Sequence, residues 1–484
     1  DWLAEHSIKG SPKLSSTPDL RENPALSATV STDIEVTVLR DIQRDAVGLL
    51  PPEVTGLPVT LWRNSTTQDL LSLLEASKVS QNPSIQSLTM RVMLAEGDAP
   101  YDSNGKFNFL RAKLEKLIQY GAIDPALAML ERAAPLPAPL VPILFDLSMY
   151  SEALEPACEQ VLQLGAAFEN DSARIYCLAR RGEWQSANIM LTTAEALQSL
   201  TPRETALLHF FLETGSEKTS DLYFSADSVL TPLEYRLYEA FGEPVPANDL
   251  PLAFSVAELS GDKGWKAQLE AAERLSKSGV FSDNQLLGLL TKKPAPASGG
   301  IWDRVTMIQD LEQALEANAP ARISDALRTV WSAMGTSALA TPIARLFYKR
   351  LVAANLLKQD LVLVHEMGLL TDHYQDAAKA LITRSRKHRL EVAVALNRFT
   401  FFSPRNEFEQ AILKAYKTPR IPYSVSNLLA QGKLGEVILN ATLQFEKGSD
   451  GDLQDLIEAL STLRHIGLDD TARRATLSLI KLGY

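Results

Sequence analysis

The sequence has few of the residues that mark a disulfide-rich, collagen-like, membrane-spanning or nucleic-acid-binding protein. Two cysteines and 24 glycines among 484 residues exclude a disulfide framework and a collagen repeat. No run approaches ~18 uninterrupted apolar residues, so we expect no membrane-spanning helix. The net charge of −11 argues against nucleic acid as the main partner. The 45% hydrophobic share excludes disorder over the whole length and is enough to bury a core.

The motifs of the common catalytic and cofactor sites are also missing. No His-Glu-x-x-His zinc motif, Gly-Lys-Ser/Thr phosphate loop or Gly-x-Ser-x-Gly elbow occurs in the chain. His365-Glu366 is followed by His373, which is eight residues from the first histidine and therefore about two helical turns away. We therefore expect no catalytic residue, no cofactor and no metal site, and we do not expect an enzyme.

The first 65 residues differ from the rest of the chain. Residues 1–32 are rich in Ser, Thr and Pro and are interpreted as a tail or linker. Within residues 33–65, Ile34, Val36 and Val38 alternate with polar residues at the period of a strand, and residues 59–62 are a candidate return strand. We expect a small β-containing cap or docking segment there. The chain begins at Asp1 and not at Met, and we expect a trimmed export signal.

Helical patterns dominate from about residue 66 onward, and a short pattern recurs among them. A Leu is followed by Gly four residues later and by a small or apolar residue five further on. The copies are Leu117/Gly121/Ala126, Leu178/Gly182/Ala187, Leu428/Gly432/Val437 and Leu463/Gly467/Ala472, with Leu275/Gly279/Asn284 looser and Leu351/Asn355/Asp360 carrying Asn for Gly. Leu would close the apolar face of one helix, and Gly or Asn would take the left-handed position that ends it. The repetition predicts helix–turn–helix units in series.

The segments 178–187 (LARRGEWQSA) and 120–128 (YGAIDPALA) resemble the middle of tetratricopeptide units. Gly432 and Gly467 are 35 residues apart, close to the ~34-residue period of those units. The resemblance is to the tetratricopeptide-like α-solenoid superfamily and covers about residues 66–484. It implies an all-α superhelix with a concave groove for protein segments. The general texture is also similar to that of exported alphaproteobacterial proteins.

The charge distribution indicates a division of the helical region near residues 291–300, a Pro/Ala/Ser/Gly stretch. Residues 1–300 carry 25 basic and 39 acidic residues, whereas residues 301–484 carry 23 and 20. We therefore predict an acidic helical-repeat part over 66–290 and a second helical-repeat part over 301–484. The acidic surface either is simply solvated or orients a partner.

The two cysteines lie on consecutive predicted helices. Cys158 and Cys177 are nearly equidistant from the turn near residues 165–170, so an antiparallel hairpin would bring them level. They form either a disulfide, which would indicate an oxidising compartment such as the periplasm, or two buried reduced thiols.

The densest basic cluster follows residue 340. Its members are Arg345, Lys349, Arg350, Arg384, Arg386, Lys387 and Arg389. They are a candidate patch for an acidic partner or anionic lipid, and the alternative is a solvated set of helix ends.

Three functions follow as hypotheses. The first is a non-catalytic scaffold that binds another protein of the bacterial envelope, for example within a flagellar or secretion machine. The second is a structural subunit whose acidic first part meets the last part of another copy. The third is a cell-wall-acting enzyme with an α-superhelical body. We expect a periplasmic location, with the cytoplasm as the alternative.

Overall fold

The described part of the protein is all-helical. The computed structural model describes residues 44–151, 153–212, 229–242, 245–260, 262–400 and 402–483. These ranges contain 25 α-helices, seven 3₁₀-helices and no strand, apart from one isolated parallel bridge between Leu50 and Ala95. The predicted all-α class is confirmed for these ranges.

The first fourteen α-helices are α1 (Pro52–Thr55), α2 (Thr67–Ala76), α3 (Pro83–Leu94), α4 (Asn108–Gln119), α5 (Ile123–Arg132), α6 (Val141–Tyr150), α7 (Leu154–Leu164), α8 (Asp171–Arg180), α9 (Trp184–Ala196), α10 (Pro202–Leu212), α11 (Pro232–Ala240), α12 (Phe254–Ala257), α13 (Trp265–Lys277) and α14 (Asp283–Leu290). The remaining α-helices are α15 (Ile301–Glu316), α16 (Pro320–Met334), α17 (Ala340–Ala353), α18 (Leu361–Gly368), α19 (Tyr374–Ile382), α20 (Arg389–Leu396), α21 (Glu407–Lys417), α22 (Tyr423–Ala430), α23 (Leu434–Ser449), α24 (Leu453–His465) and α25 (Asp469–Leu482). The 3₁₀-helices are η1 (Arg44–Ala46), η2 (Val59–Leu61), η3 (Ala138–Leu140), η4 (Gly165–Ala167), η5 (Ala247–Asp249), η6 (Lys358–Asp360) and η7 (Arg386–His388).

The recurrent glycines end helices as their spacing predicts. All five have a left-handed backbone, with φ between 71° and 89°: Gly121, Gly182, Gly279, Gly432 and Gly467. At each of them the next residue's N–H donates to the carbonyl of the patterned leucine, at distances from 2.8 to 3.2 Å. This bond satisfies a carbonyl that the helix end would otherwise leave open. The small residues that follow in the four regular copies are completely buried, so adjacent helices pack closely there.

The expectation for Asn355 is wrong. Helix α17 ends at Ala353, and Ala354 is extended with φ −79° and ψ 161°. The left-handed asparagines among the described residues are Asn318 and Asn397. The chain stays extended after α17 because the next element, η6, is held on α16 by Arg328, which donates two hydrogen bonds of 2.7 and 2.9 Å to Asp360.

The expected return strand at residues 59–62 is also wrong. Residues 59–61 form the 3₁₀-helix η2, which begins after Pro58, and Trp62 has a right-handed helical backbone. Leu61 and Trp62 are both buried, although consecutive residues of a strand would point to opposite faces. Residues 34–38 and the predicted tail at 1–32 lie outside the described residues.

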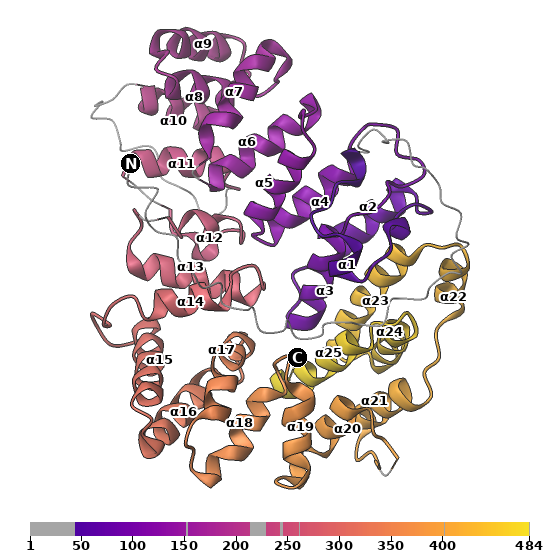
Figure 1. Cartoon of the computed structure of the whole chain (residues 1–484). Coiled ribbons are helices and arrows are strands. Elements are labelled where there is room, and N and C mark those ends of the chain that lie inside the picture. Colours follow the sequence, from indigo (N-terminus) through magenta and orange to yellow (C-terminus); the bar gives the residue numbers. More distant parts are fainter. Residues whose placement is uncertain are drawn as a thin grey trace, which may run out of the picture.

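The last helices return to the first ones. Helices that follow one another in the chain pack together, and α23 and α25 then pack on α2 and α3, as Figure 1 shows in yellow and indigo. Asn82 donates from Nδ2 to the carbonyl of Ala475 at 2.9 Å, and Asn64 donates to Gln431 at 3.0 Å. The described chain is therefore a closed arch of helical hairpins.

Contacts also cross the predicted boundary at 291–300. Arg304 donates to both carboxylate oxygens of Glu273 at 2.7 Å. Gln309 donates to the carbonyls of Leu290 and Lys293 at 2.9 and 2.8 Å. The division into two parts stays a prediction, and in the structure the helices on its two sides are in contact. None of the described helices combines the length and the hydrophobicity needed to cross a bilayer.

Candidate functional site

A polar cavity of about 1090 Å³ lies between helices from the two ends of the described chain. Helices α3, α17, α19 and α25 supply most of its wall, and Figure 1 shows them grouped around the C-terminus. Five arginines and four aspartates are among the lining residues. The return of α25 to α3 creates this cavity, so it exists only in the folded chain.

The wall on the α25 side is a row of ion pairs. Asp469 lies between Arg464, at 2.7 Å, and Arg473, one helical turn further on. Arg474 contacts Asp470 at 2.7 Å and also reaches Asp372 at the start of α19. Residues four apart on a helix are neighbours, so the sequence DDxxRR at 469–474 favours these pairs locally.

Arg464 joins three elements. It donates from Nη1 to the carbonyls of Ala415 and Tyr416 at 3.0 and 2.7 Å, and its guanidinium lies 4.4 Å from the Tyr416 ring centre. Its Nη2 donates to Asn397 at 3.3 Å. These contacts fix the ends of α20 and α21 against α24, so this arginine serves to position the wall.

The charges of the wall also set its protonation states. Burial alone would raise the pKa of Asp372, but the guanidinium groups of Arg474 and Arg345 hold it below its usual range. Burial, together with the nearby Asp470, raises the pKa of Tyr374 to about 12. At neutral pH the wall therefore presents an ionised carboxylate and a protonated phenol.

Other side chains of the cavity are exposed to solvent. Ser87, Gln375, Asp376 and His465 are exposed and contribute hydroxyl, amide, carboxylate and imidazole groups. Asp376 pairs with Lys379 at 2.8 Å, and Gln375 donates to the Tyr374 hydroxyl at 3.2 Å. Such a mixture supplies both donors and acceptors, as a peptide backbone requires. Among the described residues no group of three or more His, Cys, Asp or Glu side chains could hold a metal ion.

The cysteines lie away from this cavity, on α7 and α8. In the structure, Cys158 and Cys177 are joined by a disulfide of 2.07 Å, with Cα atoms 5.1 Å apart. A smaller cavity of about 340 Å³ adjoins the disulfide, with Leu154 and Leu162 beside Glu155 and Arg180 in its lining.

The predicted basic patch is divided between α17 and residues 384–389. Three of its seven members are bound to carboxylates. Arg345 contacts Asp283 at 2.7 Å, Arg389 contacts Glu409 at 2.7 Å, and the third pair is Arg350–Glu312.

The other four members of the patch, Lys349, Arg384, Arg386 and Lys387, are exposed. Burial and the charge of Arg384 lower the pKa of the adjacent His365. A role of these residues in binding stays a prediction.

The comparisons with known proteins leave the family open. No family model, no curated protein and no solved structure matches this chain.

The sequence analysis missed the cavity. The local signal was present in the acidic and basic pairs at 469–474, which are spaced one turn apart. No sequence pattern indicates that residues 469–474 and Ser87 of α3 line the same cavity, because these two segments are far apart in the chain.

Proposed function

We propose that this protein is a non-catalytic scaffold of tetratricopeptide-like hairpins, an irregular α-solenoid, that binds a segment of another protein in the polar cavity. The observation that carries the proposal is the cavity between α3, α17, α19 and α25, lined by polar side chains. Helical repeats commonly present such concave surfaces to protein segments.

The size and chemistry of the cavity favour a polypeptide. Its volume of about 1090 Å³ is slightly above the ~300–1,000 Å³ typical of small-molecule pockets. The arginines of the α25 wall are engaged by Asp372, Asp469 and Asp470, so the wall is nearly balanced in charge. An extended segment with mixed polar groups suits this surface better than a compact anion does.

The cellular setting is part of the same proposal. The Cys158–Cys177 disulfide supports an oxidising compartment, and a bacterial periplasm is the one we propose. The partner would then be another envelope protein, for example a component of a flagellar or secretion machine.

A variant that fills the cavity tests the proposal. Ser87→Trp places an indole on the α3 side of the cavity, and Ser72→Trp on α2 is the control because Ser72 is exposed and is not part of the lining. The full chain is used to select binders from a random-peptide phage library, and the affinities of the selected peptides are measured by calorimetry. We expect Ser87→Trp to weaken binding at least ~10-fold, or ~1.4 kcal/mol, and Ser72→Trp to leave it unchanged.

The opposite pattern would overturn the proposal. If the selected peptides bind Ser87→Trp as tightly as the unmodified chain, the cavity is not their site. If no peptide is selected by the unmodified chain, it does not bind extended segments.

A further inference from the structure

The Cys158–Cys177 disulfide forms part of the wall of an open cavity. It joins α7 to α8, and both cysteines line the smaller cavity of about 340 Å³. The charged residues of this lining are all exposed: Glu155, Glu159, Arg180 and Arg181. The space beside the two sulfur atoms is therefore connected to solvent, and a small molecule can enter it.

The two cysteines differ in their exposure. Cys158 is 8% exposed, whereas Cys177 is 0% exposed. In thiol–disulfide exchange a thiolate attacks one of the two sulfur atoms, and access decides which of them reacts faster. The difference in exposure therefore favours attack at Cys158, with Cys177 as the sulfur that leaves.

The cavity has the size and the lining for a small, uncharged thiol. Its volume of about 340 Å³ is near the lower end of the ~300–1,000 Å³ typical of small-molecule pockets. Leu154 and Leu162 form the apolar part of the wall, and the two carboxylates and two guanidinium groups of the lining balance in charge. A short thiol with a polar end, such as 2-mercaptoethanol, suits this mixed surface and needs no charged group to enter it.

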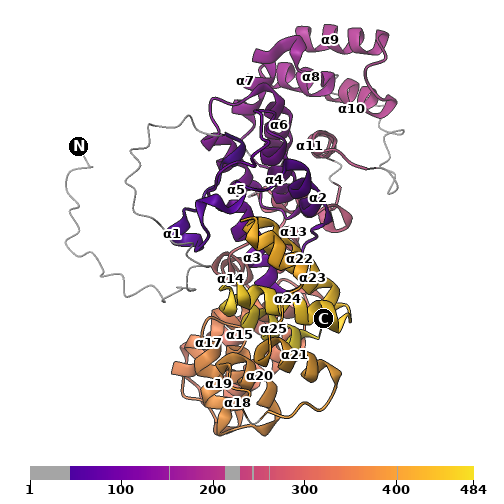
Figure 2. The same ribbon diagram turned by 90° about the vertical axis from the view of Figure 1, so that its right-hand side faces the viewer.

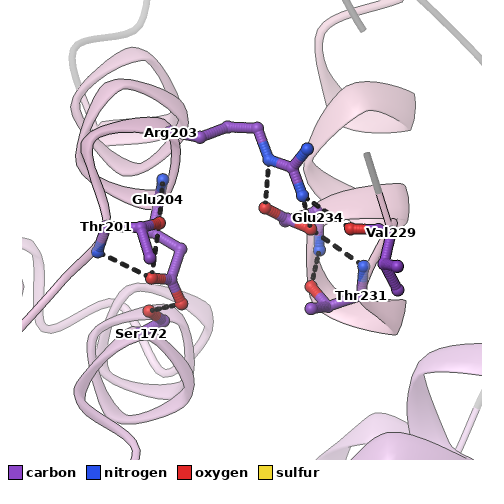
Figure 3. Close-up of polar contacts among 7 residues, drawn as sticks. All are labelled: Ser172, Thr201, Arg203, Glu204, Val229, Thr231 and Glu234. Carbon is purple, nitrogen blue, oxygen red and sulfur yellow. Dashed lines mark hydrogen bonds and ion pairs between the residues drawn. The ribbon is translucent and has the colours of Figure 1, made fainter. Parts of the chain in front are cut away.

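Helix α8 is held in place by contacts other than the disulfide. Figures 1 and 2 show α7–α10 as a lobe at one end of the molecule. Figure 3 shows Glu204 of α10 bound to Ser172 of α8, at 2.8 Å, and Arg203 of α10 bound to Glu234 of α11. Arg203 also donates to the carbonyl of Val229 at 2.8 Å. These contacts keep α8 attached to α10 and α11 when the sulfur–sulfur bond opens.

Helix α7 depends more on the disulfide than α8 does. Its buried residues are Ala157, Cys158 and Val161, and it packs on α6 and α8. An ion pair between α7 and α8 joins Glu155 to Arg180 at 3.7 Å, and the Glu155 side chain is 79% exposed. Because an exposed pair of this kind contributes little to stability, opening of the disulfide should loosen α7 more than α8.

We propose that Cys158 is a site of reversible S-thiolation by small thiols that enter this cavity. The thiolate of the small molecule attacks Sγ of Cys158 and forms a new sulfur–sulfur bond with it. The bond to Cys177 breaks, and its electron pair leaves with Sγ of Cys177, which takes up a proton from solvent. Attack by the Cys177 thiolate on the adduct restores the original disulfide and releases the small thiol. The exchange needs no external oxidant, and the adduct leaves α7 without its covalent link to α8.

Mass spectrometry of the full chain after a brief reaction with 2-mercaptoethanol tests the proposal. Free thiols are blocked with N-ethylmaleimide in a weakly acidic denaturant, and the adduct is then mapped by peptide. We expect the adduct on Cys158 at least ~10-fold more often than on Cys177. The same reaction in urea is the control, because unfolding exposes both sulfur atoms and the two adducts should then be about equal. Equal adducts in the folded chain, a preference for Cys177, or reaction only after unfolding overturns the proposal.

A variant that fills the cavity gives the second readout. Leu162→Trp places an indole beside the disulfide and should slow the reaction of Cys158 at least ~10-fold. The matched control is Leu197→Trp, because Leu197 is 72% exposed and is not part of the lining, and it should react as the unmodified chain does. Circular dichroism shows whether each variant folds.

Hydrogen exchange compares the adduct with the unmodified chain, and its rate should rise more in α7 than in α8. If Leu162→Trp folds and reacts as fast as the unmodified chain, the thiol does not use this cavity and the proposal is wrong. An equal rise of hydrogen exchange in both helices would contradict the loosening of α7. Peptide binding in the polar cavity is measured separately, so these results do not depend on the proposed function.

Discussion

The guanidinium of Arg203 binds both carboxylate oxygens of Glu234, with Nε 2.6 Å from one and Nη2 2.8 Å from the other. Glu234 is only 3% exposed, and its carboxylate also accepts from the backbone N–H of Thr231 as part of the cap of α11. One carboxylate therefore both begins a helix and attaches that helix to α10.

Loss of this pair should destabilise the protein strongly. Arg203→Ala leaves the buried Glu234 without its cation, and we expect the free energy of unfolding to fall by about 3 kcal/mol. The control is Arg181→Ala, since Arg181 and its partner Glu183 are 56% and 41% exposed, and its loss should change stability by less than ~0.5 kcal/mol. Urea unfolding followed by circular dichroism measures both, and equal effects would contradict this account.

The closure of the arch depends on a glycine. A Cβ atom on Gly435 of α23 would lie 2.4 Å from the ring of Trp62 and 2.9 Å from the carbonyl oxygen of Leu61. Both neighbours are buried, so neither has room to move away. We expect Gly435→Ala to lower the free energy of unfolding by about 1–3 kcal/mol.

A second glycine serves as the control for this prediction. Gly288 on α14 is exposed, and a Cβ atom there would meet nothing within 4 Å. Gly288→Ala should raise stability by about 0.5–1 kcal/mol, because alanine favours the helix. Thermal unfolding and hydrogen exchange in α2 and α23 compare the two variants, and unchanged protection in Gly435→Ala would show that the contact does not close the arch.

Asp146 on α6 should make stability fall as the pH rises. Burial raises its pKa to about 6, whereas an unfolded aspartate titrates near ~3.9. The folded state therefore binds the proton more tightly, and this contribution is complete below pH ~4 and is lost as the pH rises through 6. Asp146→Asn should consequently raise the melting temperature at pH 7.5 and have little effect at pH 4. A variant that lowers the melting temperature at pH 7.5 would show that the carboxylate has a stabilising partner when ionised.

Lys113 on α4 should have the opposite dependence on pH. It is 1% exposed, and it donates to the carbonyl of Val47 at 2.7 Å. Burial lowers its pKa to about 7, although Asp45 opposes the shift. The unfolded state binds the proton more tightly, so the contribution of Lys113 to stability grows between pH 7 and pH ~10.

A comparison with Lys113→Met isolates this effect. Loss of the hydrogen bond to Val47 is a constant cost, so the pH-dependent part of the difference in unfolding free energy reports the titration of Lys113. The difference between the unmodified chain and the variant should increase in favour of the unmodified chain from pH 7 to pH 10. Lys266→Met is the control, since the Lys266 side chain is 63% exposed, and a flat difference for Lys113→Met would refute the shifted pKa.

Several features of the fold were predictable because they depend on neighbouring residues. The left-handed glycine at position 121, 182, 279, 432 or 467 ends a helix, and the N–H of the residue after it donates to the carbonyl of a leucine five residues before that donor. The energy of that turn is local, so the sequence pattern is sufficient to find it. The pattern was misleading at position 355, where Asn stands in place of Gly. There the path of the chain depends on the ion pair between Arg328 of α16 and Asp360 of η6.

The seven basic residues of the predicted patch show a different limit. The sequence shows that Arg345, Arg350 and Arg389 are close to other cations in the chain, but it does not show which carboxylates face them. Asp283, Glu312 and Glu409 come from other helices and bind these side chains in the structure. The side chains that a ligand can reach are therefore fewer than the sequence indicates.

The sequence by itself determined that the described part of this protein is helical and where many of its helices end. Only the tertiary structure decided that α25 returns to α3 and that a polar cavity lies between them. The physical reason is the range of the interactions. Helix ends and charge patterns follow from residues a few positions apart, whereas the closure of the arch depends on buried contacts such as Asn82 with Ala475, which are 393 residues apart in the chain.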